Sequence, residues 1–199
     1  MSTMQIPHFK ERKATQVAAL LIKHNGGQSI DKYKLLKLIY LVDRKALELW
    51  GHSVTYDTPE NFPYDPIGPG PTPSHTYDLI DPPKRNLQET SSTSSYWSQF
   101  FSNHGGTVSL PGLFPGVGDL SPAEIGLIHE IFEEFGHKTF GELKEYLQAL
   151  PEYKDIEGSS KPIKWEILLQ AVGWTGEDLE EVKKDLTFKA KFETFVGAR

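Results

Sequence analysis

The segment from Asp31 to Trp50 most constrains how this chain can fold. Asp31 is a favourable helix N-cap, Gly51 supplies a C-terminal stop, and no proline lies between them. One apolar stripe has helical spacing, and further apolar residues widen it well beyond one face. A helix that is apolar over most of its circumference is usually central, so we expect this helix to be buried. The stripe is formed by Leu35, Leu38, Ile39, Val42, Ala46 and Leu49, and it is widened by Leu36, Tyr40 and Leu47.

Helix signals recur on both sides of this segment. Ser121 with Glu124 and Thr139 with Glu142 have the spacing of capping boxes, and Thr175 precedes acidic residues that favour a helix N-terminus. We therefore predict a mainly α (α+β) fold, a compact helical domain around the buried central helix with one or two short hairpins or strand pairs. The other expected helices are 11–24, 74–80, one after each capping box, 165–172 and one that starts near 175.

Strand signals are few and short. Val54 to Tyr56 reads as a short strand, and Asn103–Gly106 reads as the turn of a hairpin whose first arm, 96–101, could also be helical. Residues 57–73 contain six prolines and two glycines, which indicates an irregular loop. Prolines should also exclude 58–67 from a central strand.

Composition excludes several classes of site. The 199 residues include no cysteine, so disulfides, iron–sulfur clusters and thiolate zinc sites are excluded. We find no signal peptide or membrane span, and we expect a cytoplasmic protein. A net charge of −6 disfavours direct nucleic-acid binding. We expect the basic residues of the central helix to mark its solvent edge; these are Lys32, Lys34, Lys37, Arg44 and Lys45.

No catalytic motif stands out, so we expect neither enzyme activity, nor a metal, nor a cofactor. His129 and Glu133 are spaced i, i+4 with His137 beyond, but three converging ligands are needed and a solvated helix face is the simpler interpretation. Ser74, His75 and Asp78 could be imagined as a triad. The simpler hypothesis is that Ser74 caps a short helix and Asp78 lies on the surface.

Several blocks of the sequence resemble those of one known family. KLLKLIYLVDR at 34–44 and WGHSVTYD at 50–57 resemble the signature helix and the following turn and strand of the Panacea domain, the SocA-like antitoxin family of type II toxin–antitoxin systems. GPTPS at 70–74 with YDLI at 77–80 resembles its Gly-Pro turn and tyrosine helix. LSPAE at 120–124, FGH at 135–137 and GSSKPI at 158–163 resemble its C-terminal half. The resemblance spans 9–173, and 58–67 departs from it because a family strand is replaced by proline-rich sequence.

The resemblance implies an antitoxin that neutralises an adjacently encoded toxin by direct binding. Two alternatives stay open: a proteolytic adaptor that delivers the toxin to a protease, and a small enzyme with a His/carboxylate site near the Pro/Gly loop. We assign 1–173 to the Panacea domain and 174–199 to a C-terminal helical extension. The fold signature consists of Leu35, Leu38, Tyr40, Asp43, Gly70, Pro71 and Ser74. The expected partner-binding residues are Phe62, Tyr64, Ile67, His75 and Tyr77. An alternative stays open for the loop residues Phe62, Tyr64 and Ile67, whose side chains could instead fold back to cover the core.

The C-terminal extension has its own apolar pattern. Phe188, Phe192, Phe195 and Val196 follow i, i+4, i+7, i+8 spacing between charged residues. Such a stripe either packs on its own domain or binds a partner groove. We favour packing on the domain.

Overall fold

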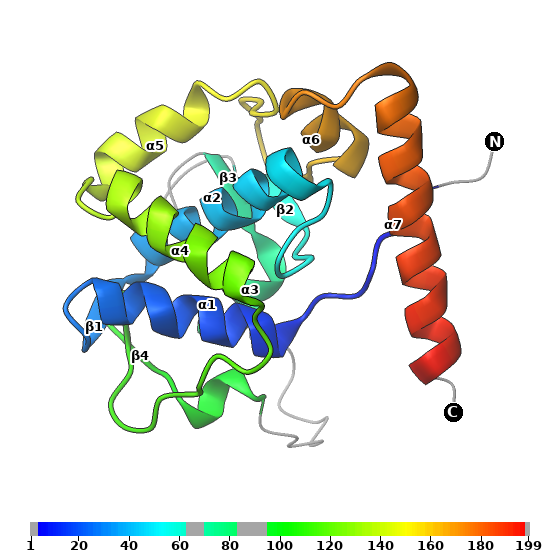
Figure 1. The fold of residues 1–199 in the computed structure, drawn as a ribbon. Helices are drawn as coiled ribbons and strands as arrows, with labels where there is room; N and C mark the ends of the chain where they lie inside the picture. The colour runs from blue at the N-terminus through cyan, green and yellow to red at the C-terminus, as the bar shows by residue number, and fades with distance from the viewer. Residues whose placement is uncertain (1–3, 63–69, 83–94, 198–199) are drawn as a thin grey trace.

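A computed structural model describes residues 4–62, 70–82 and 95–197, and these form a mainly helical α+β fold, as predicted (Figure 1). The helices are α1 (Glu11–His24), α2 (Lys32–Trp50), α3 (Ser74–Ile80), α4 (Pro122–Phe135), α5 (Phe140–Gln148), α6 (Trp165–Ala171) and α7 (Gly176–Gly197), with a 3₁₀ turn η1 (Trp97–Gln99). The strands are β1 (Ser29–Asp31), β2 (Pro59–Phe62), β3 (Gly70–Pro73), β4 (Ser102–His104), β5 (Thr107–Ser109) and β6 (Lys161–Pro162).

Helix α2 is the buried centre of the fold, which confirms the prediction from its apolar circumference. Asp31 caps it by accepting hydrogen bonds from the backbone N–H groups of Tyr33 and Lys34, and Gly51 ends it in the left-handed conformation. The helix contacts α1, α4, α5 and α6, which surround it in Figure 1. Its last turn reaches solvent: Leu49 is 49% exposed, so its assignment to the buried stripe was wrong.

Capping sequences set the starts of the C-terminal helices. Ser121 and Glu124 form a complete capping box at α4, and Thr139 and Glu142 form one at α5. Each box satisfies N–H groups that a helix start leaves unpaired. Both helices therefore begin where the sequence predicts.

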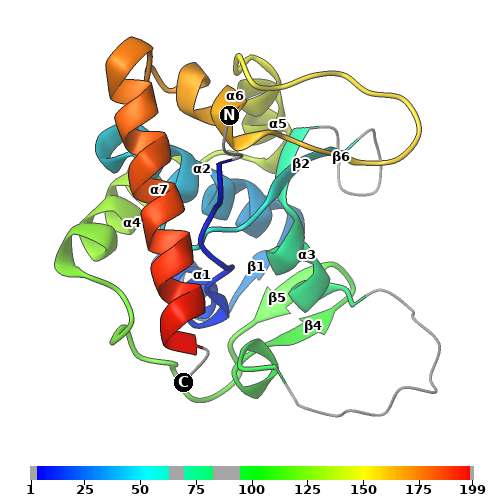
Figure 2. The same cartoon turned by 90° about the vertical axis from the view of Figure 1, so that its right-hand side faces the viewer.

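Two small antiparallel sheets flank the helices. One has the order β1-β5-β4, and its β4–β5 hairpin turns at Gly105 and Gly106, within the predicted turn. The first arm is Ser102–His104 and not the predicted 96–101. The segment before β4 contains η1, so part of the first predicted arm is helical. The other sheet has the order β3-β2-β6, and Figure 2 shows it beside α3.

The second sheet contradicts the expectation that prolines exclude a central strand. Strand β2 lies between β3 and β6. Pro59 is its first residue and contributes a carbonyl, which accepts a hydrogen bond from the Ile163 N–H (2.9 Å). The remaining prolines of this sheet lie in edge strands, where a missing N–H is tolerated.

The strand expected at Val54 to Tyr56 is also absent. These residues form a loop, and Tyr56 has a φ of 53°. The left-handed region is uncommon for a residue with a side chain and cannot continue an extended strand. Asp43 of α2 determines the shape of this loop, as described below.

Candidate functional site

Polar side chains of α2 attach the surrounding segments to the helix. Lys37 is fully buried, and its Nζ donates hydrogen bonds to the Thr72 hydroxyl (2.7 Å) and to the carbonyls of Pro71 (3.1 Å) and Gly70 (3.4 Å). The expectation that Lys37 lies at the solvent edge was wrong, because strand β3 supplies acceptors inside the fold. It was wrong for Lys32 too, which is buried and pairs with Asp81. Burial lowers the pKa of Lys37 to about 7.

The next turn of α2 binds the segment that follows α5. Glu152 is buried, and its Oε1 accepts hydrogen bonds from the Tyr40 hydroxyl (2.6 Å) and the Arg44 Nε (2.6 Å). A buried carboxylate is tolerated when it is paired and hydrogen-bonded, as here. Glu152 is therefore a structural residue, and the sequence analysis did not identify it.

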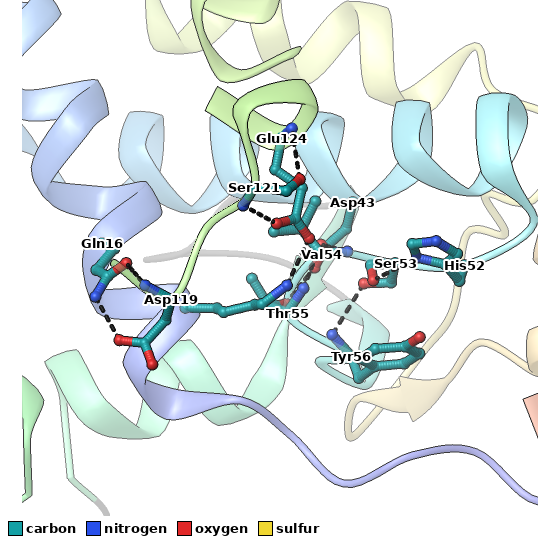
Figure 3. Close-up of polar contacts among 11 residues, drawn as sticks. Gln16, Asp43, His52, Ser53, Val54, Thr55, Tyr56, Asp119, Ser121 and Glu124 are labelled. Atoms are coloured by element: carbon teal, nitrogen blue, oxygen red, sulfur yellow. Dashed lines mark hydrogen bonds and ion pairs between the residues drawn. The ribbon is translucent and has the colours of Figure 1, made fainter. Parts of the chain in front are cut away.

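Asp43 holds the loop after α2 (Figure 3). Its Oδ1 accepts hydrogen bonds from the N–H groups of Val54 (3.0 Å) and Thr55 (2.9 Å), and its Oδ2 accepts one from the Thr55 hydroxyl. Burial raises the pKa of Asp43 to about 6, although the hydrogen bonds from Thr55 oppose that rise. The same loop continues to Asp57, which caps α3.

Asp57 performs the role that we expected of Ser74. Its carboxylate accepts hydrogen bonds from the N–H groups of His75 (2.9 Å) and Thr76 (2.8 Å) at the start of α3. The Ser74 hydroxyl instead donates to the Thr58 carbonyl (2.7 Å). Ser74 is therefore not the cap of the helix, because a carboxylate from the preceding loop occupies that place.

An open groove of about 390 Å³ lies between β2 and α3. The rings of Phe62 and Tyr77, both partly exposed, meet at its apolar side with their centroids 5.7 Å apart. Glu60 and Asp78 contribute carboxylates, and Ser160 also reaches the groove. Three of the predicted partner-binding residues, Phe62, His75 and Tyr77, thus line one groove, whereas Tyr64 and Ile67 lie outside the described residues.

His75 is exposed at the groove and is oriented from behind. Its ring stacks on Phe9 (centroids 5.0 Å apart), and its Nδ1 lies 3.1 Å from Asp57 Oδ1. The hydrogen bond with Asp57 raises the pKa of His75 above its ordinary value. The acidic partner is Asp57 and not Asp78, and Ser74 is turned to Thr58, so the imagined triad is not formed.

We expect Asp57→Asn to lower the pKa of His75, because the amide removes the negative charge beside the imidazole, while its one oxygen can still accept a hydrogen bond from the start of α3. The measurement is an NMR titration of the His75 ring protons in the folded protein. Asp78→Asn is the control and should produce a smaller decrease, since its charge acts on His75 without a hydrogen bond. An unchanged His75 pKa in Asp57→Asn would contradict the pairing.

His129 on α4 and His137 beyond its end belong to no metal-binding cluster, since no group of three potential ligands converges among the described residues. The His129 ring instead lies against the His24 ring of α1, with centroids 5.1 Å apart. Likewise, no described helix is both long and apolar enough to cross a bilayer.

Comparison with known protein families gives a match that covers most of α2 and several of the segments that it contacts. A model of the family described as antitoxin SocA-like, Panacea domain, matches residues 35–152, more than half of the chain. The chain belongs to this family. The match starts in α2 and ends at Glu152, so it includes the residues with which Lys37, Tyr40, Asp43 and Arg44 make their buried contacts. No curated protein and no solved structure matches the chain.

Membership of the Panacea family indicates an antitoxin-like role in general terms. The groove between β2 and α3 lies within the matched range, except for Ser160. Helices α6 and α7 lie beyond it, so the domain boundary that we placed at 173 stays a prediction.

Proposed function

We propose that this chain is an antitoxin that neutralises a cognate toxin, encoded by a neighbouring gene, through direct protein–protein binding. Membership of the SocA-like Panacea family is the observation that carries the proposal. The buried carboxylates of Asp43 and Glu152 accept hydrogen bonds within the fold, whereas His75 is exposed and faces an open groove. An open, partly apolar groove with charged edges suits a protein partner.

We further propose that the groove between β2 and α3 contacts the toxin. Phe62 and Tyr77 form a small aromatic anchor, and aromatic residues are common energetic centres of interfaces. Glu60 and Asp78 make the same groove acidic, so it fits a toxin surface that combines an apolar group with Lys or Arg. Tyr64 and Ile67, between β2 and β3 in the sequence, stay predicted partner-binding residues.

We expect Phe62→Ala and Tyr77→Ala each to weaken toxin binding about thirtyfold, which corresponds to roughly 2 kcal/mol for a desolvated anchor. The two rings touch, so the double variant should lose less than the sum of the two effects. The measurement is the Kd of the purified pair by calorimetry, together with rescue of growth on co-expression. Circular dichroism should show unchanged helix content.

Leu113→Ala is the matched control, because Leu113 is 81% exposed and lies outside the groove. It should bind with the parental Kd. If Phe62→Ala and Tyr77→Ala stay folded and bind equally well, the groove is not the contact. If no neighbouring protein binds or is neutralised, the antitoxin proposal itself fails.

The enzyme alternative is favoured by one observation, the pairing of His75 with Asp57 at an open groove. His75→Gln separates the two functions, because glutamine keeps a polar side chain at the proposed toxin-binding groove but cannot transfer a proton as histidine does, and direct neutralisation needs no proton transfer. We expect this variant to rescue growth, whereas an enzymatic antitoxin would lose rescue with its binding intact. A proteolytic adaptor would shorten the toxin's lifetime in cells, and a pulse-chase measurement distinguishes that mechanism from occlusion.

A further inference from the structure

Helix α7 packs on the domain along one face. Leu179, Leu186 and Ala190 are buried on that face. Val182 packs against the end of α2, where a Cβ built on Gly51 would lie 2.8 Å from its Cγ2. The preceding Trp174 donates a hydrogen bond from its indole Nε1 to the Leu47 carbonyl (2.8 Å). The orientation of α7 about its own axis is therefore fixed.

An N-terminal strap, residues 4–10, holds the second half of α7 in place (Figure 2). The Gln5 N–H donates to the Thr187 hydroxyl (3.3 Å), and the His8 N–H donates to the Glu193 carboxylate (3.1 Å). Lys10 forms an ion pair with the same carboxylate at 2.5 Å. These contacts determine which residues of the second half face outward.

The outward face of this half is aromatic, which contradicts our expectation that the stripe packs on its own domain. The packed positions are instead Leu186 and Ala190, on the opposite side of the helix. The rings of Phe188 and Phe192 stack with their centroids 6.4 Å apart. The exposed fractions of this face, which we call the aromatic face, are 68% for Phe188, 58% for Phe192, 62% for Phe195 and 52% for Val196.

Lysines border the aromatic face. Lys184 and Lys191 are exposed one turn on either side of Phe188, and neither forms an ion pair with any described residue. Both line a groove of about 770 Å³ that extends from Phe188 to Met4 of the strap. Glu166 and Glu180 also line it, but both pair with Lys183, so Lys184 and Lys191 leave the lining with a net positive charge. The patch thus offers an aromatic ridge, a neighbouring hollow and free positive charge, in a protein whose net charge is negative.

The charges favour one kind of occupant. A second copy packed antiparallel about the Phe188–Phe192 pair would bring Lys184 and Lys191 of both copies into one region, and like charges repel. A flat anionic bilayer would meet the acidic first turns of the same helix, Glu177 to Glu181. An amphipathic helix with acidic edges covers the aromatic ridge and compensates the lysines at once.

We propose that the aromatic face of α7 and its lysine border form a docking surface for an acidic amphipathic helix of a partner protein. The surface lies outside the family-matched range and is separate from the groove between β2 and α3. It therefore gives this chain a second binding site, and it does not depend on the toxin-binding proposal.

The test uses the full chain and two fluorescent synthetic helices with apolar residues at i, i+3, i+4 and i+7. One peptide has glutamates beside its apolar face and the other has lysines at the same positions. Fluorescence anisotropy should show at least tenfold tighter binding of the glutamate peptide, with a Kd that weakens as salt rises. Phe188→Ala/Phe192→Ala should weaken that binding at least tenfold, and Lys184→Glu/Lys191→Glu should reverse the preference between peptides.

Leu113→Ala and Lys154→Glu are the controls, because both alter exposed residues outside α7, and circular dichroism checks that all variants fold. Equal binding of the two peptides, or a preference that survives the charge reversal, would overturn the proposal. Two other results would assign the surface elsewhere and overturn it too. They are a dimer in sedimentation that the Phe188→Ala/Phe192→Ala variant abolishes, and phosphatidylserine vesicles that compete with the peptide.

Discussion

Leu38→Ala is expected to lower the free energy of unfolding by about 2–5 kcal/mol, the range observed when a fully buried leucine is truncated. Leu38 is completely buried in the middle of α2, the helix that the surrounding elements contact. The deletion removes apolar contacts and leaves a cavity that rigid neighbours cannot fill completely. Urea unfolding followed by circular dichroism measures the change.

Leu49→Ala is the matched control on the same helix. Leu49 is 49% exposed, so its truncation should cost well below half as much as that of Leu38. Equal effects of the two substitutions would show that α2 is not packed as described. An unchanged midpoint for Leu38→Ala would refute the central position of the helix.

The free energy of unfolding should rise with pH between about pH 7 and the ordinary pKa of lysine. Lys37→Met is expected to remove that rise. Burial lowers the pKa of folded Lys37 to about 7 from the ordinary lysine value of 10.5. Between these values the unfolded chain binds one more proton than the folded protein, so the unfolding free energy rises with pH. The slope approaches about 1.4 kcal/mol per pH unit. Below the folded pKa both states are protonated and this contribution no longer changes.

The measurement compares urea unfolding at about pH 7 and about pH 9 for both proteins, and the Lys37 contribution is their difference. Lys45→Met is the control, because Lys45 lies on the same helix with an exposed side chain that pairs with Glu48. It should retain the parental slope. A slope that persists in Lys37→Met would show that Lys37 stays charged within the fold.

Helix positions could be predicted because their signals are local. The N-cap at Asp31, the capping boxes at Ser121 and Thr139, and the stop at Gly51 satisfy backbone groups within a few residues, and the structure places helix ends there. Burial of α2 could also be predicted, since apolar residues cover most of its circumference. The family followed from the blocks that surround this helix.

The errors arose where the deciding partner is distant in the sequence. Lys37 is buried because Thr72 accepts its hydrogen bond, and α3 is capped by Asp57 and not by the adjacent Ser74. Strand β2 tolerates Pro59 because its neighbours in the sheet need only the carbonyl of that residue. No pattern within a short window of sequence contains these partners.

The sequence by itself thus determined the helices, the central position of α2 and the family, because capping and apolar periodicity act within one or two turns. The tertiary structure alone decided which polar groups meet. It placed Phe62, His75 and Tyr77 around one groove, and it turned the aromatic face of α7 to solvent by packing Leu186 and Ala190 instead. Both faces of that helix carry apolar residues at helical spacing. Only the fit of one face against the end of α2 and the N-terminal strap determines which of them is buried.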